Sequence, residues 1–116
     1  MKPINLPIFP LKLVVLPGTL QGLQIFEPRY LNMVKQCMSN ASNFVISYKS
    51  DRFDDFDFGI EKVGTSVQIV DFNNLPNGLL GITVKAESKV SLNNIIQLED
   101  ESYLGEVLPL TEPEVD

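Results

Sequence analysis

The sequence contains no histidine and only one cysteine, Cys37. The absence of histidine excludes the Ser-His-Asp and Cys-His arrangements that activate a nucleophile. A lone cysteine excludes an internal disulfide and leaves too few of the usual ligands for a zinc site. A catalytic serine–lysine pair stays open, although no such pair stands out. No phosphate-binding loop of the G-x-x-x-x-G-K-[ST] or G-x-G-x-x-G type is present. We therefore expect no catalytic residues, no metal and no cofactor.

Long apolar runs are also missing from the sequence. The run Leu13–Leu16 is far shorter than the roughly 20 residues that a membrane-spanning helix needs. Four prolines, Pro3, Pro7, Pro10 and Pro17, interrupt the N-terminal apolar stretch, which therefore does not resemble a signal peptide. Together with the single cysteine, these absences predict a soluble, cytoplasmic protein without a membrane partner.

Charge is unevenly distributed along the 116 residues, whose net charge is −6. Residues 99–116 contain seven acidic residues and no basic residue, whereas residues 1–98 are nearly neutral. An acidic segment repels phosphate backbones, which argues against nucleic acid as a main partner. The length predicts one domain over residues 1–116, with the last strand and the chain end inside the acidic segment 99–116.

Short apolar segments separated by turn residues make up most of the chain. The expected strands lie near residues 6–9, 20–25, 43–50, 63–72, 79–86, 88–98 and 102–110. The alternation of apolar and polar residues slips at Val70 and Phe72, which indicates a bulge. Asn77-Gly78 is typical of a hairpin turn. This pattern predicts a mainly β fold, a small barrel or sandwich of six or seven strands.

One helix is expected after the stretch IFEPRY. Pro28 suits the first helical position, and Glu27 then falls at the N-cap, where a negative charge is favourable. Phe26 and Leu31 have the spacing of a hydrophobic staple. The expected apolar face consists of Tyr30, Leu31, Val34, Cys37 and Met38. We interpret Glu27 and Arg29 mainly as residues that start the helix and tie it to the sheet. A role in binding stays open.

Four segments occur in the order typical of one family: LPIFPLKLVVLPG, LQIFEPRYLNMV, VGTSVQIVDFNNLPNGLLGITVKAESKVSL and YLGEVLPL. Over nearly its whole length the sequence resembles the Lon N-terminal domain, the substrate-recognition module of ATP-dependent Lon proteases. Residues 43–61 are the least typical part. The structural signature that carries the resemblance consists of Phe26, Glu27, Pro28, Arg29 and Tyr30.

The resemblance implies a PUA-like, mostly antiparallel pseudobarrel of about six strands with one packed α-helix. It implies a non-catalytic domain that recognises unfolded or tagged polypeptides, together with a protease or ATPase partner and without an ATPase or peptidase domain of its own. A helical subdomain follows the barrel in many relatives, and this chain ends about where that part would begin. Because PUA-like folds include RNA binders, an RNA-binding module is the alternative.

Two positions depart from the family pattern. The family often has a glycine and then an arginine in the strand after the hairpin, where this sequence has Ala86 and Lys89. If the glycine permits a bend in the strand, the chain has to bend at Ala86 with a different backbone conformation. If the arginine contacts a ligand, Lys89 lacks the bidentate guanidinium fork. We therefore do not carry over a ligand contact in this strand.

The segment DRFDDFDFG combines acidic residues with three aromatic rings. Its aspartates, Asp51, Asp54, Asp55 and Asp57, do not match the ligand spacing of an EF-hand calcium loop. The rings of Phe53, Phe56 and Phe58 either close an end of the barrel or form a recognition patch. As substrate-binding candidates they would contact clients that have basic residues beside an apolar stretch.

Overall fold

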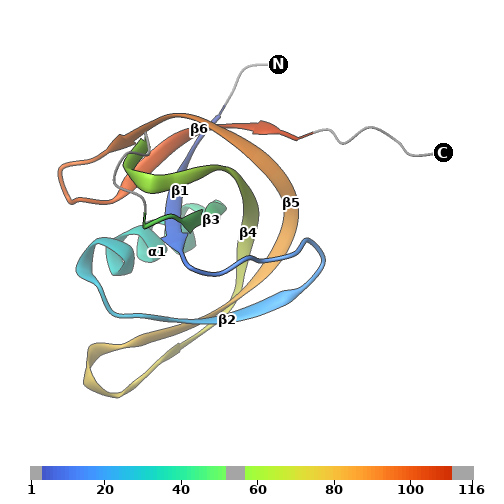
Figure 1. Ribbon diagram of the computed structural model, residues 1–116. Helices are drawn as coiled ribbons and strands as arrows, with labels where there is room; N and C mark the ends of the chain where they lie inside the picture. Colours follow the sequence, from blue (N-terminus) through green and yellow to red (C-terminus); the bar gives the residue numbers. More distant parts are fainter. Residues whose placement is uncertain (1–3, 52–56, 111–116) are drawn as a thin grey trace.

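The computed structural model describes residues 4–51 and 57–110. It contains one α-helix and six strands (Figure 1): β1 (Ile4–Leu11), β2 (Leu20–Ile25), α1 (Pro28–Asn40), β3 (Phe44–Lys49), β4 (Ile60–Asn74), β5 (Leu80–Gln97) and β6 (Tyr103–Pro109). Short 3-10 turns at Asp57–Gly59 and Pro76–Gly78 precede β4 and β5. Within these residues, no helix is long and apolar enough to cross a membrane.

The strands form one sheet in the order β2-β5-β4-β3-β1-β6, and β5 also pairs with β6. The second pairing closes five strands into a ring and leaves β2 outside it, on β5. All pairs are antiparallel except β1 with β3. The parallel pair requires a long crossover, which β2 and α1 supply. The prediction of a mainly β pseudobarrel with one helix is confirmed, with a mixed rather than fully antiparallel sheet.

Strands β4 and β5 are long enough to take part in the ring and in an extension beyond it. The hairpin that joins them projects from the body of the molecule, with β2 alongside β5 (Figure 1). Residues 79–86 and 88–98, expected as two strands, form the single strand β5. Its pairing with β4 shifts register between Ser66 and Val67 and again between Ile69 and Asp71. The second shift confirms the bulge predicted at Val70, and such irregularities bend a strand.

The connection between β1 and β2 forms main-chain hydrogen bonds with strand β5 at Ala86. The N–H of Ala86 donates to Thr19 O at 2.9 Å, and the N–H of Gly18 donates to Ala86 O at 2.8 Å. Farther along the same connection, Thr65 Oγ1 donates to Val15 O at 2.8 Å. The backbone of Ala86, where relatives often have glycine, is therefore fully paired in ordinary extended geometry.

The buried residues form two clusters, one beneath α1 and one within the ring. In the first cluster, the Phe9 ring lies 4.4 Å from that of Tyr30 and 6.3 Å from that of Phe44. Ile8 and Val45 belong to the second cluster, on the opposite side of their strands. Successive residues of a strand point to opposite faces, so the apolar run IF in β1 contributes to both clusters.

The apolar face of α1 differs in part from the prediction. Tyr30, Val34 and Cys37 are buried as expected, but Met33, only 3% exposed, was not predicted, and Leu31 is partly exposed. Phe26 is 65% exposed, which is incompatible with the expected staple to Leu31. The reason is the alternation of β2: Ile25 points into the core, so the next side chain points outward.

Burial along α1 predicts which truncation costs more. We expect Met33→Ala to lower the free energy of unfolding by about 2–5 kcal/mol, because it opens a cavity in the core. Leu31→Ala should cost clearly less, because Leu31 is already partly solvated. Both variants place alanine in the same helix, so helix propensity is matched. Urea denaturation of the two variants tests this order, and equal midpoints would contradict it.

Candidate functional site

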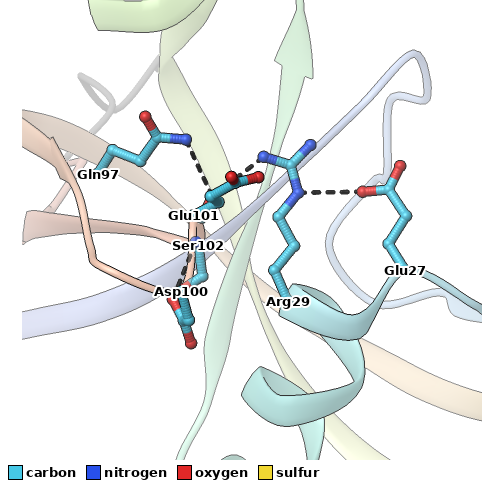
Figure 2. Close-up of polar contacts among 6 residues, drawn as sticks. All are labelled: Glu27, Arg29, Gln97, Asp100, Glu101 and Ser102. Carbon is cyan, nitrogen blue, oxygen red and sulfur yellow. Dashed lines mark hydrogen bonds and ion pairs between the residues drawn. The ribbon is translucent and has the colours of Figure 1, made fainter.

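The N-terminal end of α1 is fixed to the turn between β5 and β6 through Arg29. Arg29 Nε donates to Glu27 Oε2 at 3.0 Å, and Arg29 Nη1 donates to Glu101 O at 3.0 Å (Figure 2). Glu27 occupies the N-cap position as predicted, but its side chain makes no capping bond to the helix. Its carboxylate instead holds Arg29 in place. The hydrogen bond from Arg29 to Glu101 joins residues that are 72 positions apart in the sequence.

Further polar contacts hold the same turn. Asn32 Nδ2 donates to Asp100 Oδ2 at 3.1 Å, and both the hydroxyl and the N–H of Ser102 donate to Asp100 Oδ1. Gln97 Nε2 donates to Glu101 O at 3.1 Å (Figure 2). The hydrogen bonds from Ser102, followed by the one from Asn32, lower the pKa of Asp100 below its ordinary value. The Asp100 carboxylate therefore stabilises the turn by accepting these hydrogen bonds.

Arg29 also lies against aromatic rings. Its guanidinium carbon is 4.8 Å from the ring centre of Tyr30 and 5.7 Å from that of Tyr103. Burial, the largest single effect, would lower the pKa of Arg29. The hydrogen bond from Arg29 to Glu27 and the electrostatic interactions with Glu27, Tyr30 and Tyr103 together outweigh it, so the pKa is raised. Burial raises the pKa of Tyr30 to about 12, against the opposing effect of Arg29. These arrangements stabilise charged Arg29 and neutral Tyr30.

Of the three predicted recognition rings, the structure describes Phe58, while Phe53 and Phe56 lie outside the described residues. Phe58 is 44% exposed, and its ring centre lies 5.2 Å from that of Tyr103. One side of the ring therefore packs on the body and the other faces solvent. Phe58 has a positive φ of 63°, and Lys49 Nζ donates to its carbonyl at 3.0 Å.

The described side chains form no cluster of metal ligands. In residues 4–51 and 57–110, no group of three or more candidate ligands could hold a metal ion. Asp51 accepts a hydrogen bond from Lys12 Nζ at 2.6 Å, whereas Asp54 and Asp55 lie outside the described residues. Every buried polar side-chain atom in the described part of the chain has a hydrogen-bond partner.

A groove that the sequence analysis missed lies between the C-terminal end of α1 and strand β4. We call it the edge groove; its volume is about 420 Å³. Its lining consists of Cys37, Met38, Ala41, Ser42, Gln68, Ile69, Val70, Asp71 and Phe72. Val70 and Phe72 are 48% and 51% exposed, respectively. The slip in alternation at these two residues was the sequence signal for this site, although it predicted only a bulge.

A second groove, of about 320 Å³, lies where β2, β5 and β4 run side by side. Asp71 and Phe72 line both grooves, so these two residues connect them. Gly22 and Gly81 belong to its lining, as does Leu75, whose side chain lies over Gly81. Both shared residues belong to the outer half of β4, so this part of the strand contributes to both grooves.

The contacts of Arg29 predict unequal effects of two charge deletions on α1. We expect Arg29→Ala to lower the free energy of unfolding by about 1–2 kcal/mol, because it removes two hydrogen bonds and packing against two rings. Lys35→Ala, on the exposed side of the same helix, should cost less than about 0.5 kcal/mol. Equal denaturation midpoints for the two variants would contradict the role given to Arg29.

The raised pKa of Tyr30 predicts a loss of stability at alkaline pH. The folded state holds the Tyr30 proton more tightly than the unfolded state, whose pKa is close to 10.0. This contribution is fully present below pH 10 and falls by about 2 kcal/mol as the pH approaches 12. Tyr30→Phe should lack this fall, whereas Tyr48→Phe at an exposed tyrosine should keep it. Urea denaturation at pH 9 and pH 11.5 measures the difference.

Residues 5–116 match the family of ATP-dependent protease La (LON) substrate-binding domains. The chain is similar to a solved Lon N-terminal domain protein from Xanthomonas campestris, at 31% identity, 97% coverage of this chain and a TM-score of 0.81. The N-terminal domain of Mycobacterium avium complex Lon protease covers 97% of this chain with a TM-score of 0.76. At 15% identity, the latter shows the shared fold alone.

The Lon protease of Fusobacterium nucleatum subsp. nucleatum is 24% identical over 102 residues, which make up 84% of this chain and 13% of that protein. The chain spans 63% of the Xanthomonas chain and 58% of the Mycobacterium chain. The family match accounts for nearly all of the 116 residues, which contain no protease or ATPase domain. The chain belongs to the family of Lon substrate-binding domains.

Proposed function

We propose that this domain is a non-catalytic recognition module for unfolded or tagged polypeptides. The observation that carries the proposal is the edge groove, where Val70 and Phe72 expose apolar surface beside Met38. Family membership supports polypeptides in general as the substrate class. The absence of a metal cluster from the described part of the chain, and of histidine from the whole sequence, is in keeping with binding without chemistry.

The apolar surface of the edge groove is unfavourable in water unless a partner covers it. Burying apolar area contributes roughly 25 cal/mol per Å², so covering two such side chains provides a driving force for binding. Unfolded polypeptides expose apolar segments that folded proteins hide, and they would compete best for this surface. The net charge of −6 keeps the free domain apart from its own copies while the groove stays open.

The aromatic segment remains a second proposed contact surface. Phe58 presents one side of its ring to solvent, and Phe53 and Phe56 are close to it in the sequence. Phe58 packs on Tyr103, whose ring also contacts Arg29 at the end of α1 opposite to the edge groove. We further propose a cytoplasmic location and a protease or ATPase as the partner that receives the bound polypeptide.

The proposal predicts binding of a permanently unfolded polypeptide, such as a reduced and alkylated protein, by the purified domain. Phe72→Ser should weaken this binding at least fivefold, with the melting temperature unchanged within a few degrees, because Phe72 is half-exposed. Phe26→Ser is the matched control, since Phe26 is exposed but lines neither groove. Fluorescence anisotropy gives the Kd values. Phe58→Ser measures the contribution of the second surface.

Salt dependence separates polypeptide binding from RNA binding. Apolar contacts should hold the Kd within a few-fold between 50 and 300 mM salt, whereas phosphate contacts would weaken binding by orders of magnitude. Absence of binding to unfolded polypeptide, or tighter binding of single-stranded RNA with a steep salt dependence, would contradict the proposed function.

A further inference from the structure

The outer half of β4 is an open strand edge. On one side, β4 pairs with β5 as far as Asn74. On the other side, its pairing with β3 ends at Val67, opposite Phe44. In the described part of the chain, residues 68–74 therefore have no strand on the side away from β5. An open edge presents main-chain N–H and C=O groups that can pair with another chain.

The edge groove borders this open edge. Its lining includes five consecutive residues of β4, Gln68 to Phe72. The pairing of β4 with β3 ends at Val67, so all five of these residues lie where β4 has no partner strand on the side away from β5. The groove therefore runs along the unpaired part of β4. The C-terminal end of α1 forms the opposite wall, at Cys37, Met38 and Ala41.

The electrostatic character of the edge groove is negative. Asp71 is the one charged residue in its lining. Helix α1 ends at the groove with no basic residue in its last turn, so the partial negative charge of the helix C-terminus is not neutralised from within the helix. A ligand that places a positive charge beside Asp71 would complement both features.

We propose that an extended polypeptide segment binds in the edge groove by adding a strand to residues 68–72 of β4. Main-chain hydrogen bonds hold the segment at the edge, an apolar side chain packs against Met38 and Phe72, and a lysine or arginine lies beside Asp71. This inference rests on the proposed function and specifies how the polypeptide is held. Strand addition needs no particular sequence, whereas the two side-chain contacts select apolar segments with a basic residue.

A second copy of this chain is a poorer occupant of the same edge. Pairing two β4 edges would bring two Asp71 carboxylates together within two chains that each carry a net charge of −6. In the free domain, Asp71 Oδ1 accepts a hydrogen bond from the N–H of Phe72 at 2.8 Å. This N–H is then already paired and does not favour pairing with the edge of a second copy.

The first test uses a ten-residue apolar peptide with one lysine, N-methylated at one position at a time. In strand addition only alternate peptide N–H groups point to the edge. Methylation at every second position should therefore weaken binding about tenfold, and methylation at the positions between should change it less than twofold. Binding that is equally sensitive, or equally insensitive, at all positions would overturn strand addition while leaving polypeptide recognition intact.

The second test probes the charge contact. Wild-type protein should bind the lysine peptide at least fivefold more tightly than the same peptide with glutamate in place of lysine. Asp71→Asn should reduce this preference to less than twofold. Glu61→Gln, an equivalent change at an exposed position of the same strand, should preserve it. An unchanged preference in the Asp71 variant would overturn the proposed contact.

Amide hydrogen exchange locates the bound strand. Saturating peptide should slow exchange at one or more amides of residues 68–72 in wild-type protein, by at least tenfold. Protection at β2 instead of β4 would place the peptide on the other open edge and overturn the inference. A concentration-dependent dimer that Phe72→Ser abolishes would assign the edge to a second copy. Absence of any peptide or unfolded-protein binding would overturn the proposed function as well.

Discussion

Strand β5 pairs with three other strands, and most of the architecture depends on this arrangement. Its first half pairs with β2 and β4, and its second half pairs with β4 and β6. The ring closes only because β5 changes partners along its length, with the register shift next to Ala86. The six-residue strand β3 pairs only with the inner half of β4, and this pairing ends where Phe44, the first residue of β3, lies opposite Val67. The open edge of β4 is thus a geometric consequence of closing a ring with strands of unequal length.

Helix α1 turns this open edge into a groove, because its C-terminal end lies opposite the unpaired part of β4. Arg29 ties its first turn to the β5–β6 turn, and Ala41 ends it in a left-handed conformation with its N–H bonded to Cys37 O. Met38 is thereby held in the wall that faces Val70 across the groove. A wall that is already ordered loses little conformational freedom when a ligand binds, so more of the contact energy remains as affinity.

Local chemistry in the sequence predicted the elements, and long-range pairing decided the rest. Pro28 after Glu27 predicted the start of α1, and the slip at Val70 predicted the bulge. The fusion of two expected strands into β5 could not be read locally, because β2 and β6 each stabilise a different half of it. The edge groove could not be predicted from local sequence patterns either, because its two walls are about 30 residues apart in the sequence. Phe58 is 44% exposed, and its contact with Tyr103 was not predicted, because the two rings come from distant parts of the sequence.

The proposed function requires a domain that binds many different polypeptides with little dependence on their sequence and that does not bind its own copies. Main-chain pairing meets the first requirement, because every residue except proline offers the same donor and acceptor. Asp71 disfavours self-association. Its carboxylate accepts a hydrogen bond from the Phe72 N–H in the free domain, and its negative charge repels Asp71 of another copy. A basic residue on an incoming segment would pair with this carboxylate and release that N–H for the new strand. The residue that protects the edge from self-association would then also be the residue that admits a polypeptide of the right charge.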